Sequence, residues 1–255
     1  MIYWNADPIL LQLGPLAIHW YGVLFAGGFL LGYQIIQWIY RREGYPTDQL
    51  DKLLTYIFVG TVVGARLAHV VFYEPDYYFS QPLEILKIWK GGLASHGGAF
   101  GVLMAILLFV RQHPQTGTLW LMDRLAIPTA LTGCFIRLGN FMNSEIVGLP
   151  TGGNWGVVFE RIDALPRHPV QLYESLCYFV IFVLLLQLYR RQGMQRPGFG
   201  FGLFMILVFG CRLVLEFFKT PQADYEAGNL ITVGQWLSVP FILLGLFCVW
   251  RSRRH

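Results

Sequence analysis

Charged and amide side chains stand inside or at the ends of long apolar stretches of this sequence. The stretch RLGNFMNSEIVG begins at Arg137, contains Asn140 and Glu145, and directly follows the apolar run LAIPTALTGCFI. Arg212 and Glu216 stand four residues apart in another apolar run. An arginine guanidinium is planar, stays charged at any working pH and binds phosphate through two parallel hydrogen bonds. These residue types favour recognition of a phosphate group, provided that the chain brings them together.

The elements that must position these residues are apolar enough to be membrane helices. Hydrophobic residues make up 55% of the 255 positions and charged residues 13%, and the mean hydropathy is +0.49. Charge-poor windows recur with lengths close to the ~20 residues that a helix needs to cross ~30 Å of hydrocarbon. The windows are 16–39, 50–73, 93–111, 119–139, 169–189, 199–218 and 230–250.

The windows predict an all-α membrane protein, a bundle of seven transmembrane helices that forms a single integral membrane domain over residues 1–255. A membrane β-barrel is excluded because its strands would alternate apolar and polar residues, whereas these windows are continuously apolar. No Lys or Arg precedes the first apolar run, so the basic region of a cleavable signal peptide is missing and the first span should stay in the mature protein.

The distribution of basic residues predicts the orientation of the spans. Eleven Lys and Arg residues fall in one set of connections and five in the other, with three Arg left inside spans. Because cytoplasmic connections carry the excess of basic residues, we expect the C-terminus in the cytoplasm and the N-terminus outside. The net charge of +4 is then a topology signal, and it gives no support to nucleic-acid binding.

Two exterior connections are longer than the others. Residues 74–92 mix aromatic, aliphatic and charged side chains, which is typical of an arm lying in the membrane interface. Residues 141–168 are rich in Gly and Asn and predict a small exterior head. We expect neither a disulfide framework nor a metal site, because all four cysteines fall inside spans at spacings that match no zinc motif.

Glycines spaced four residues apart on the expected helices favour close helix packing over a functional role. The pairs are Gly28 and Gly32, Gly60 and Gly64, Gly97 and Gly101, and Gly198 and Gly202.

Polar residues of the spans gather at one depth when consecutive spans are given opposite directions. All of them fall in the outer half of the membrane: His19, Tyr21, Arg66, His69, His96, Arg137, Asn140, Gln171, Tyr173, Glu174, Arg212 and Glu216. A charge at the bilayer centre costs about 2.5–3.5 kcal/mol, so such groups indicate pairing or a wet cavity. A functional site explains their common depth better than isolated pairs do.

Structural alternatives stay open for several of these residues. Arg66 with His69 could join helices, and Arg212 with Glu216 could form a pair within one helix. For Gln171, Tyr173 and Glu174 a structural role at the start of span five is slightly favoured. In the outer half of a bilayer the abundant phosphate is a lipid headgroup. No nucleotide-binding GxxxxGKS motif occurs, so a transfer reaction would need a substrate that is already activated, such as a phospholipid ester.

Seven short motifs, taken in order, resemble one known family. They are IHWYG (18–22), GARLAH (64–69), GGLASHGG (91–98), RLGNFMNSEIVG (137–148), HPVQLYES (168–175), CRLVLEFFKTP (211–221) and ITVGQWLSVP (231–240). In this order they resemble the bacterial prolipoprotein diacylglyceryl transferases over nearly the whole chain, and R-x-G-N-F-x-N-x-E-x-x-G followed by HP-x-QLYE is specific to that family.

The resemblance implies a seven-helix enzyme of the bacterial inner membrane, with its N-terminus and small head in the periplasm and its active site toward the periplasmic leaflet. Such enzymes move the diacylglyceryl group of phosphatidylglycerol onto the lipobox cysteine thiol in the signal peptide of a preprolipoprotein. A thioether forms and glycerol phosphate leaves, in the first step of lipoprotein maturation, and no cofactor is implied.

The resemblance also implies which residues form the site. The family's important positions match Tyr21, His96, Arg137, Asn140, Glu145, Gly148, Arg212 and Glu216 here. His96 is the leading candidate for the base that generates the acceptor thiolate, and Tyr21 is the second. Without the family, a His beside glycines at a helix start is equally well a packing or capping residue.

The remaining positions have expected roles around the phosphate. Arg137 and Arg212 would hold it and stabilise the charge on the departing glycerol phosphate. Glu216 would orient Arg212, while Asn140 and Glu145 would fix Arg137 or the headgroup hydroxyls. Gly148 is either an ordinary turn glycine or a point where backbone closely approaches lipid, and the sequence leaves both interpretations open.

Two other functions are considered. A transporter or channel for an anionic solute would favour repeated halves and broken helices that meet near the midplane. Here no repeat is apparent and the polar groups are biased to one face. A non-catalytic scaffold for the maturation of secreted proteins would keep its activity after loss of Arg137.

Overall fold

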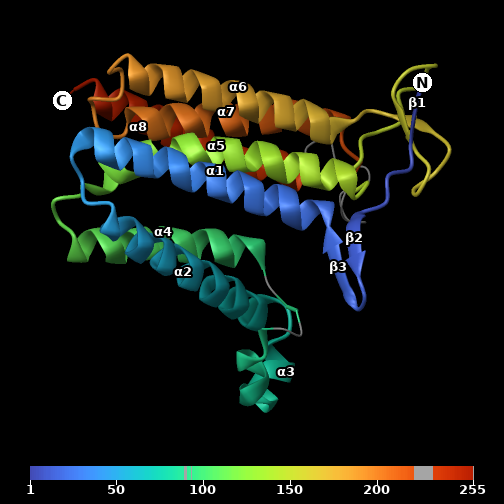
Figure 1. Ribbon diagram of the computed structural model, residues 1–255, viewed down its shortest axis with the longest axis horizontal. Coiled ribbons are helices and arrows are strands. Elements are labelled where there is room, and N and C mark those ends of the chain that lie inside the picture. The colour runs from blue at the N-terminus through green and yellow to red at the C-terminus, as the bar shows by residue number, and fades with distance from the viewer. Residues whose placement is uncertain (89–90, 93, 221–231, 255) are drawn as a thin grey trace. The chain divides into compact units, whose positions relative to one another are not determined.

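Long helices dominate the computed structural model, which describes residues 1–88, 91–92, 94–220 and 232–254 (Figure 1). Six helices are long and apolar enough to cross a membrane, and α4 is a shorter apolar helix. The helices are α1 (Trp20–Glu43), α2 (Asp48–Phe72), α4 (Ser95–Gln112), α5 (Thr118–Met142), α6 (Val170–Arg190), α7 (Phe199–Leu215) and α8 (Val233–Ser252). The chain is therefore a multi-pass membrane protein, as its composition predicted.

The start of the first predicted span differs from the structure. Residues 16–19 do not begin a helix but form strand β3 (Leu16–His19), which pairs with the antiparallel strand β2 (Ile9–Leu13). Gly14, at φ +59°, makes the turn between the strands, followed by Pro15. A short apolar run reads the same as strand or helix until its partner is known, so composition alone could not separate the two.

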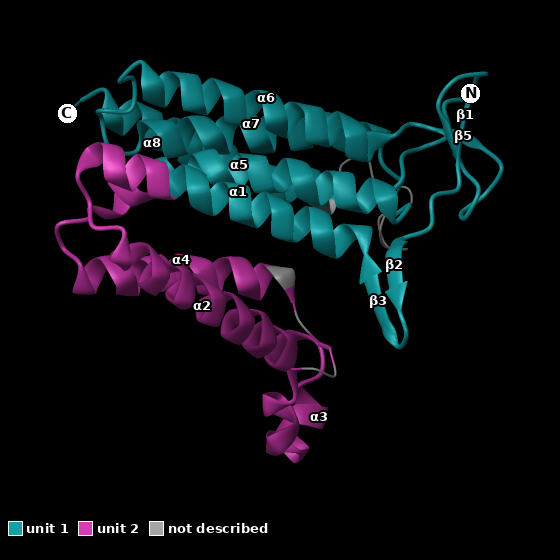
Figure 2. Ribbon diagram, in the orientation of Figure 1, with its two compact units in different colours: residues 1–36, 122–255 teal, residues 37–121 magenta. Residues whose placement is uncertain are grey.

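The chain divides into two compact units, residues 1–36 with 122–255, and residues 37–121 (Figure 2). In the second unit α2 and α4 pack through their glycines. A Cβ atom on Gly60 would lie 2.5 Å from the carbonyl oxygen of Gly101, and one on Gly64 would meet the backbone of Gly97 and Gly101. The predicted packing role of these glycines is confirmed.

The predicted arm, also in the second unit, contains helix α3 (Pro75–Ser80) and the 3₁₀ helix η1 (Pro82–Leu86). Arg66 of α2 is only 4% exposed and holds the arm in place. Its guanidinium donates to the backbone carbonyls of Glu84 (2.6 Å), Ile85 (2.9 Å) and Gly91 (2.6 Å). Arg66 was compatible with a structural role or with a role in a functional site, and these contacts support the structural role.

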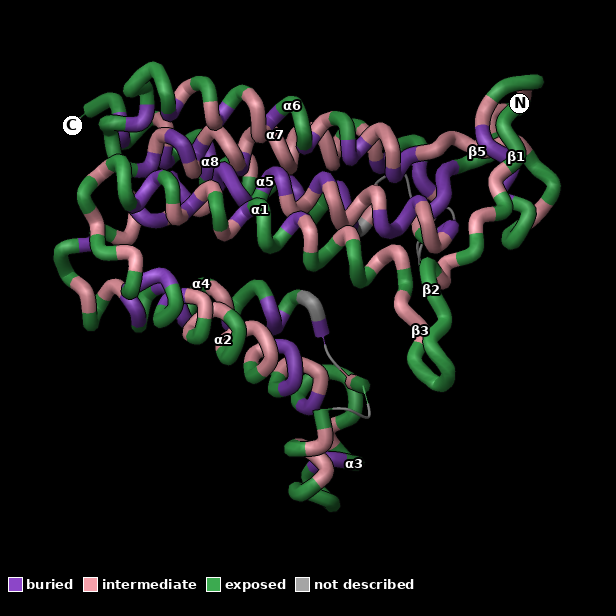
Figure 3. Tube along the Cα trace, in the orientation of Figure 1, coloured by how far each residue is buried: buried purple, intermediate pink, exposed green. Residues whose placement is uncertain are grey.

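In the first unit, α5 is the most enclosed helix. Half of its most apolar stretch is buried, against a third or less in the other five long helices, and buried segments follow its course in Figure 3. Glycines of α1 lie against it, because a Cβ on Gly28 would stand 2.8 Å from Cβ of Phe135 and one on Gly32 3.2 Å from Cβ of Pro128.

The last glycine pair serves two purposes. Gly202 packs α7 against α8, since a Cβ there would lie 2.7 Å from the carbonyl oxygen of Gly245. Gly198 does not lie on a helix face as predicted; it precedes α7 at φ +92°, a conformation that glycine adopts readily. The buried Asp123 carboxylate accepts hydrogen bonds from the backbone N–H of Gly198 (2.8 Å) and Phe201 (2.7 Å) and so caps α7.

The head contains a small sheet that the sequence did not predict. Its strands are β1 (Ile2–Trp4), β4 (Val157–Phe159) and β5 (Pro166–Arg167), in the order β1-β4-β5, with β1 parallel and β5 antiparallel to β4. Phe141, Val147, Val157 and Phe159 form its core, with Trp4 packed against them. Because Phe141 belongs to α5, this core seats the head on the end of that helix.

Candidate functional site

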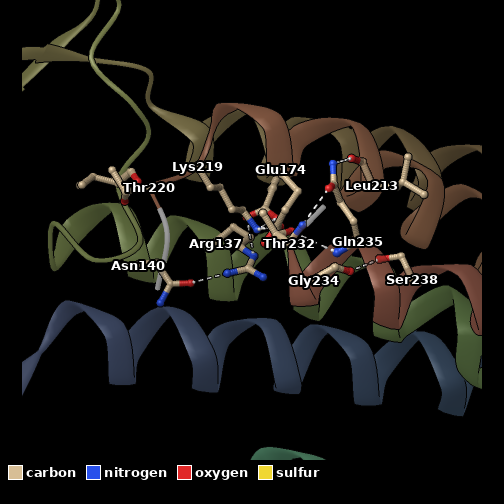
Figure 4. Close-up of polar contacts among 12 residues, drawn as sticks. Arg137, Asn140, Glu174, Leu213, Lys219, Thr220, Thr232, Gly234, Gln235 and Ser238 are labelled. Atoms are coloured by element: carbon tan, nitrogen blue, oxygen red, sulfur yellow. Dashed lines mark hydrogen bonds and ion pairs between the residues drawn. The ribbon is translucent and has the colours of Figure 1, made fainter. Parts of the chain in front are cut away.

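Arg137 lies one turn before the end of α5 and makes two polar contacts of known geometry (Figure 4). Its Nε stands 3.0 Å from Oε2 of Glu174 on α6, and its Nη1 donates to Oδ1 of Asn140 at 3.2 Å. Glu174 is 1% exposed, so its charge is nearly removed from water. A buried carboxylate needs such compensation, because an unpaired one would carry a large desolvation cost.

The ionic contacts continue beyond Arg137. The second oxygen of Glu174, Oε1, lies 2.8 Å from Nζ of Lys219, and the same Nζ lies 3.2 Å from Oε2 of Glu216. Arg137, Glu174, Lys219 and Glu216 thus form a row of alternating charges, here called the ionic row, which sums to zero. It joins α5, α6 and the 3₁₀ helix η3 (Glu216–Phe218) at the end of α7.

The far end of the ionic row lies against the start of α8. The Glu216 carboxylate stands over Gly234, where an added Cβ would be 2.6 Å from the carboxyl carbon. A capping box between Thr232 and Gln235 begins the helix there. Backbone N–H groups at a helix start carry partial positive charge, so this position also stabilises the Glu216 carboxylate.

Arg212 is placed differently from the sequence expectation. Within the described residues it has no hydrogen bond or ion pair, and the expected pair with Glu216 is not observed because Glu216 binds Lys219. The backbone keeps the i,i+4 spacing, because the N–H of Glu216 donates to the carbonyl of Arg212, so it is the Glu216 side chain that turns away, toward Lys219. Arg137 and Arg212 both act electrostatically on Tyr178 of α6.

Asn140 and Glu145 are joined in a tight turn after α5. The Glu145 carboxylate accepts hydrogen bonds from Nδ2 of Asn140 (3.1 Å) and Nδ2 of Asn143 (3.0 Å). The backbone carbonyl of Glu145 accepts a 2.6 Å hydrogen bond from Nε2 of the fully buried Gln171. Asn140 therefore links Glu145 to Arg137, as one of the two expected arrangements requires.

Backbone strain accompanies this turn. Ser144 (φ +56°) and Ile146 (φ +55°) flank Glu145 in the left-handed region, which is unfavourable for most residues and rare for a β-branched one. Such conformations cost about 1–3 kcal/mol each and persist where surrounding contacts enforce them. The strained turn aims the Glu145 carboxylate back at α5.

The other two expected site residues of the first unit have close packing partners. Tyr21, at the start of α1, covers Gly139 of α5, where an added Cβ would lie 2.8 Å from the Tyr21 ring. Tyr21 is thus next to Asn140 along α5. Gly148 is buried, donates its N–H to the carbonyl of His168 (3.1 Å) and accepts from Arg167 (3.0 Å). These contacts support the structural interpretation of Gly148.

His96 belongs to the second unit. It is the second residue of α4 and its side chain is exposed. Its assignment as a base therefore stays a prediction. The four cysteines are free, and within the described ranges no group of three or more His, Cys, Asp and Glu residues could hold a metal ion.

Two residues of the ionic row lie outside the expected site. The sequence slightly favours a structural role for Glu174, and it places Lys219 in an exterior connection. A signal was present in each case, because Glu174 ends the motif HPVQLYE and Lys219 follows Glu216 by three residues. The sequence around Glu174 and Lys219 does not show which distant charged residue forms an ion pair with either of them.

Comparisons with known proteins agree with the motifs. The family model described as prolipoprotein diacylglyceryl transferase matches residues 8–251. A phosphatidylglycerol–prolipoprotein diacylglyceryl transferase of Tolumonas auensis is 73% identical over 255 residues, covering 100% of this chain and 99% of that protein. The enzyme of the same name from Chloroherpeton thalassium is 47% identical over 253 residues, covering 98% and 94%. That of Bacteroides fragilis is 39% identical over 259 residues, covering 96% and 93%.

Proposed function

The chain belongs to the prolipoprotein diacylglyceryl transferase family, and from this membership we propose that it transfers the diacylglyceryl group of phosphatidylglycerol to the lipobox cysteine of preprolipoproteins. The cysteine thiolate attacks the carbon of the diacylglyceryl group that is bonded to the phosphate oxygen. A C–S bond forms, the C–O bond to phosphate breaks, and its electron pair leaves with glycerol phosphate. The thiol proton passes to a base, and the substrate itself supplies the leaving group, so the step requires no cofactor.

The contrast between the two arginines carries this proposal. Arg137 is anchored by Glu174 and Asn140, whereas Arg212, in an apolar helix, has no carboxylate partner among the described residues. Both interact with Tyr178. A guanidinium without a counter-ion at membrane depth favours an anionic ligand, and its planar fork suits a phosphate. The pair would stabilise the charge that develops on the departing glycerol phosphate.

The proton acceptor remains a proposal within this scheme. His96 is the leading candidate and Tyr21 the second, with Asn140 and Glu145 holding Arg137 and the headgroup. Gly148 is proposed to let the backbone of its turn approach the phospholipid closely.

We further propose seven membrane spans in one integral domain of the bacterial inner membrane, with α4 as the shortest span. The N-terminus and head would be periplasmic and the C-terminus cytoplasmic. The excess of basic residues in one set of connections supports this orientation. The ionic row brings together the end of α5, the start of α6 and the end of α7, which supports opposite directions for these successive spans.

The test is transfer of labelled diacylglycerol from phosphatidylglycerol to a lipobox peptide by the purified chain. We expect Arg137→Ala and Arg212→Ala each to lower kcat/KM by about 100-fold or more, the usual loss when a donor to developing charge is removed. Arg212→Lys should restore little, because a point charge lacks the bidentate fork. Arg161→Ala, an exposed arginine of the head, is the matched control and should act like the unmodified chain.

Full activity of Arg137→Ala, or absence of transfer by the unmodified chain, contradicts the proposal. A transporter or channel for an anionic solute is not favoured, because the named relatives are transferases.

A further inference from the structure

We propose that Glu174 and Lys219 are positioning residues, which set the orientation of Arg137 for the transfer reaction. This inference rests on the proposed function and adds two residues outside the expected set of site positions. Neither is proposed to touch the substrate. They would act through Arg137, by way of the contacts of the ionic row.

The first step concerns how the guanidinium of Arg137 is held. Glu174 binds its Nε at 3.0 Å and Asn140 binds Nη1 at 3.2 Å, so two different nitrogens are tied to two different groups. The ion pair and the hydrogen bond together restrict the positions that the planar group can take. A guanidinium has five N–H donors, so anchoring through Nε keeps donors at the terminal nitrogens for Tyr178 and for an incoming phosphate.

The second step concerns how Glu174 is held. Its other oxygen lies 2.8 Å from Lys219, whose side chain is only 4% exposed. The neighbours of Lys219 in the chain are bonded to the head: the carbonyl of Phe218 accepts from the N–H of Leu149 (2.8 Å), and Oγ1 of Thr220 donates to the carbonyl of Val147 (2.7 Å). The backbone on both sides of Lys219 is therefore held in place, which positions the Lys219 ammonium group. The ammonium group in turn restricts the side-chain conformation of Glu174.

The third step is electrostatic. A carboxylate that served Arg137 alone would neutralise it and compete with a phosphate for its donors. Sharing Glu174 with Lys219 reduces that competition, because the negative charge is divided between two cations. Glu216 in turn holds Lys219 from its other side at 3.2 Å. Lys219 thus allows Arg137 to be anchored and still to attract an anion.

A double substitution separates positioning from simple stabilisation of the fold. Removing one partner of a buried ion pair leaves an uncompensated charge, whereas replacing both with neutral groups of similar size is often close to neutral for stability. We would compare Glu174→Gln, Lys219→Met, the double variant and Lys219→Arg in the full chain. The measurements are kcat and KM for phosphatidylglycerol per folded molecule, and the melting temperature.

We expect both single variants to melt earlier and the double variant to regain most of the melting temperature. The rate of the double variant should stay low, by about 100-fold, because displacing a catalytic group by about an ångström has that effect. The loss should fall on kcat more than on KM, since Arg137 acts on charge that develops in the transition state. Lys219→Arg keeps the charge and should retain most activity.

The matched control is a Lys–Glu pair of the arm, in which Nζ of Lys87 lies 2.5 Å from Oε1 of Glu84. The double variant Glu84→Gln with Lys87→Met should keep the unmodified rate. If the Glu174→Gln with Lys219→Met variant regains both its melting temperature and its rate, the pair is structural and the inference is overturned. That result differs from failure of the proposed function, in which the unmodified chain itself would show no transfer.

Discussion

At the scale of single residues, the surroundings of an arginine decide what it can do. Arg66, Arg137 and Arg212 all lie in apolar helices, yet they have different partners. Arg66 donates hydrogen bonds to backbone carbonyls of the arm. Arg137 contacts the carboxylate of Glu174 and the side-chain amide of Asn140. Arg212 has no such partner among the described residues. Only the last two are proposed to hold a phosphate, so residue type alone does not distinguish a packing arginine from a candidate ligand.

Asp163 of the head supports a prediction at this scale. Arg167 donates to both of its carboxylate oxygens, and this hydrogen bonding lowers the pKa of Asp163 below its ordinary value. A carboxylate whose pKa is lower in the folded state stabilises the fold above its unfolded pKa, about 3.9, and that contribution is lost as pH falls through the lowered folded pKa.

The side chain is partly exposed, so we expect the pair to contribute roughly 0.2–1 kcal/mol at pH 7. Asp163→Asn should remove that contribution at pH 7 and make no difference once the pH lies below the lowered folded pKa of Asp163, where both chains lack the charge. Hydrogen exchange of the β4 and β5 amides would measure it. An equal loss of protection at both pH values would show that the charge is not responsible.

At the scale of elements, small residues let helices approach and thereby decide which side chains meet. The backbone N–H and C=O groups of α2 and α4 are bonded within each helix and do not join the two helices. The helices pack closely because glycine leaves room for one backbone to approach the other. Gly60 and Gly101 face each other with no room for a side chain. Short elements matter as well, because the chain leaves the one-turn η3 with Lys219 against Glu174 of α6.

Gly101→Ala tests the packing of α2 on α4. Its methyl group would overlap the carbonyl oxygen of Gly60, so the helices must separate, and we expect a loss of about 1–3 kcal/mol in the free energy of unfolding. Gly27→Ala in α1 is the matched control, because an added Cβ there has no neighbour within 4 Å. Thermal unfolding in detergent measures both, and equal melting temperatures would refute the packing role of Gly101.

At the scale of the whole molecule, the asymmetry of charge between the two sets of connections predicts a single orientation. A green fluorescent protein fused after the C-terminus should fluoresce, and an alkaline phosphatase fused there should be inactive, because we place that end in the cytoplasm. A phosphatase inserted in the head, after Gly153, should be active. The reverse pattern would place the ionic row at the cytoplasmic leaflet and contradict the proposed site of transfer.

The sequence by itself determined the positions of the long helices, the packing role of the glycines in α2 and α4, and the family. These properties follow from local composition and from motif order, which need no knowledge of distant contacts. Within the ionic row, the sequence identified Arg137 and Glu216 as residues with a role.

Only the tertiary structure decided which charges meet. Glu174 joins Arg137 to Lys219 across 37 and 45 positions of the chain, Glu216 binds Lys219 instead of Arg212, and residues 16–19 pair as a strand. Each of these outcomes depends on how helices and turns approach one another in space. A side chain in apolar surroundings takes whichever partner the packing brings within reach, and sequence spacing does not record that partner.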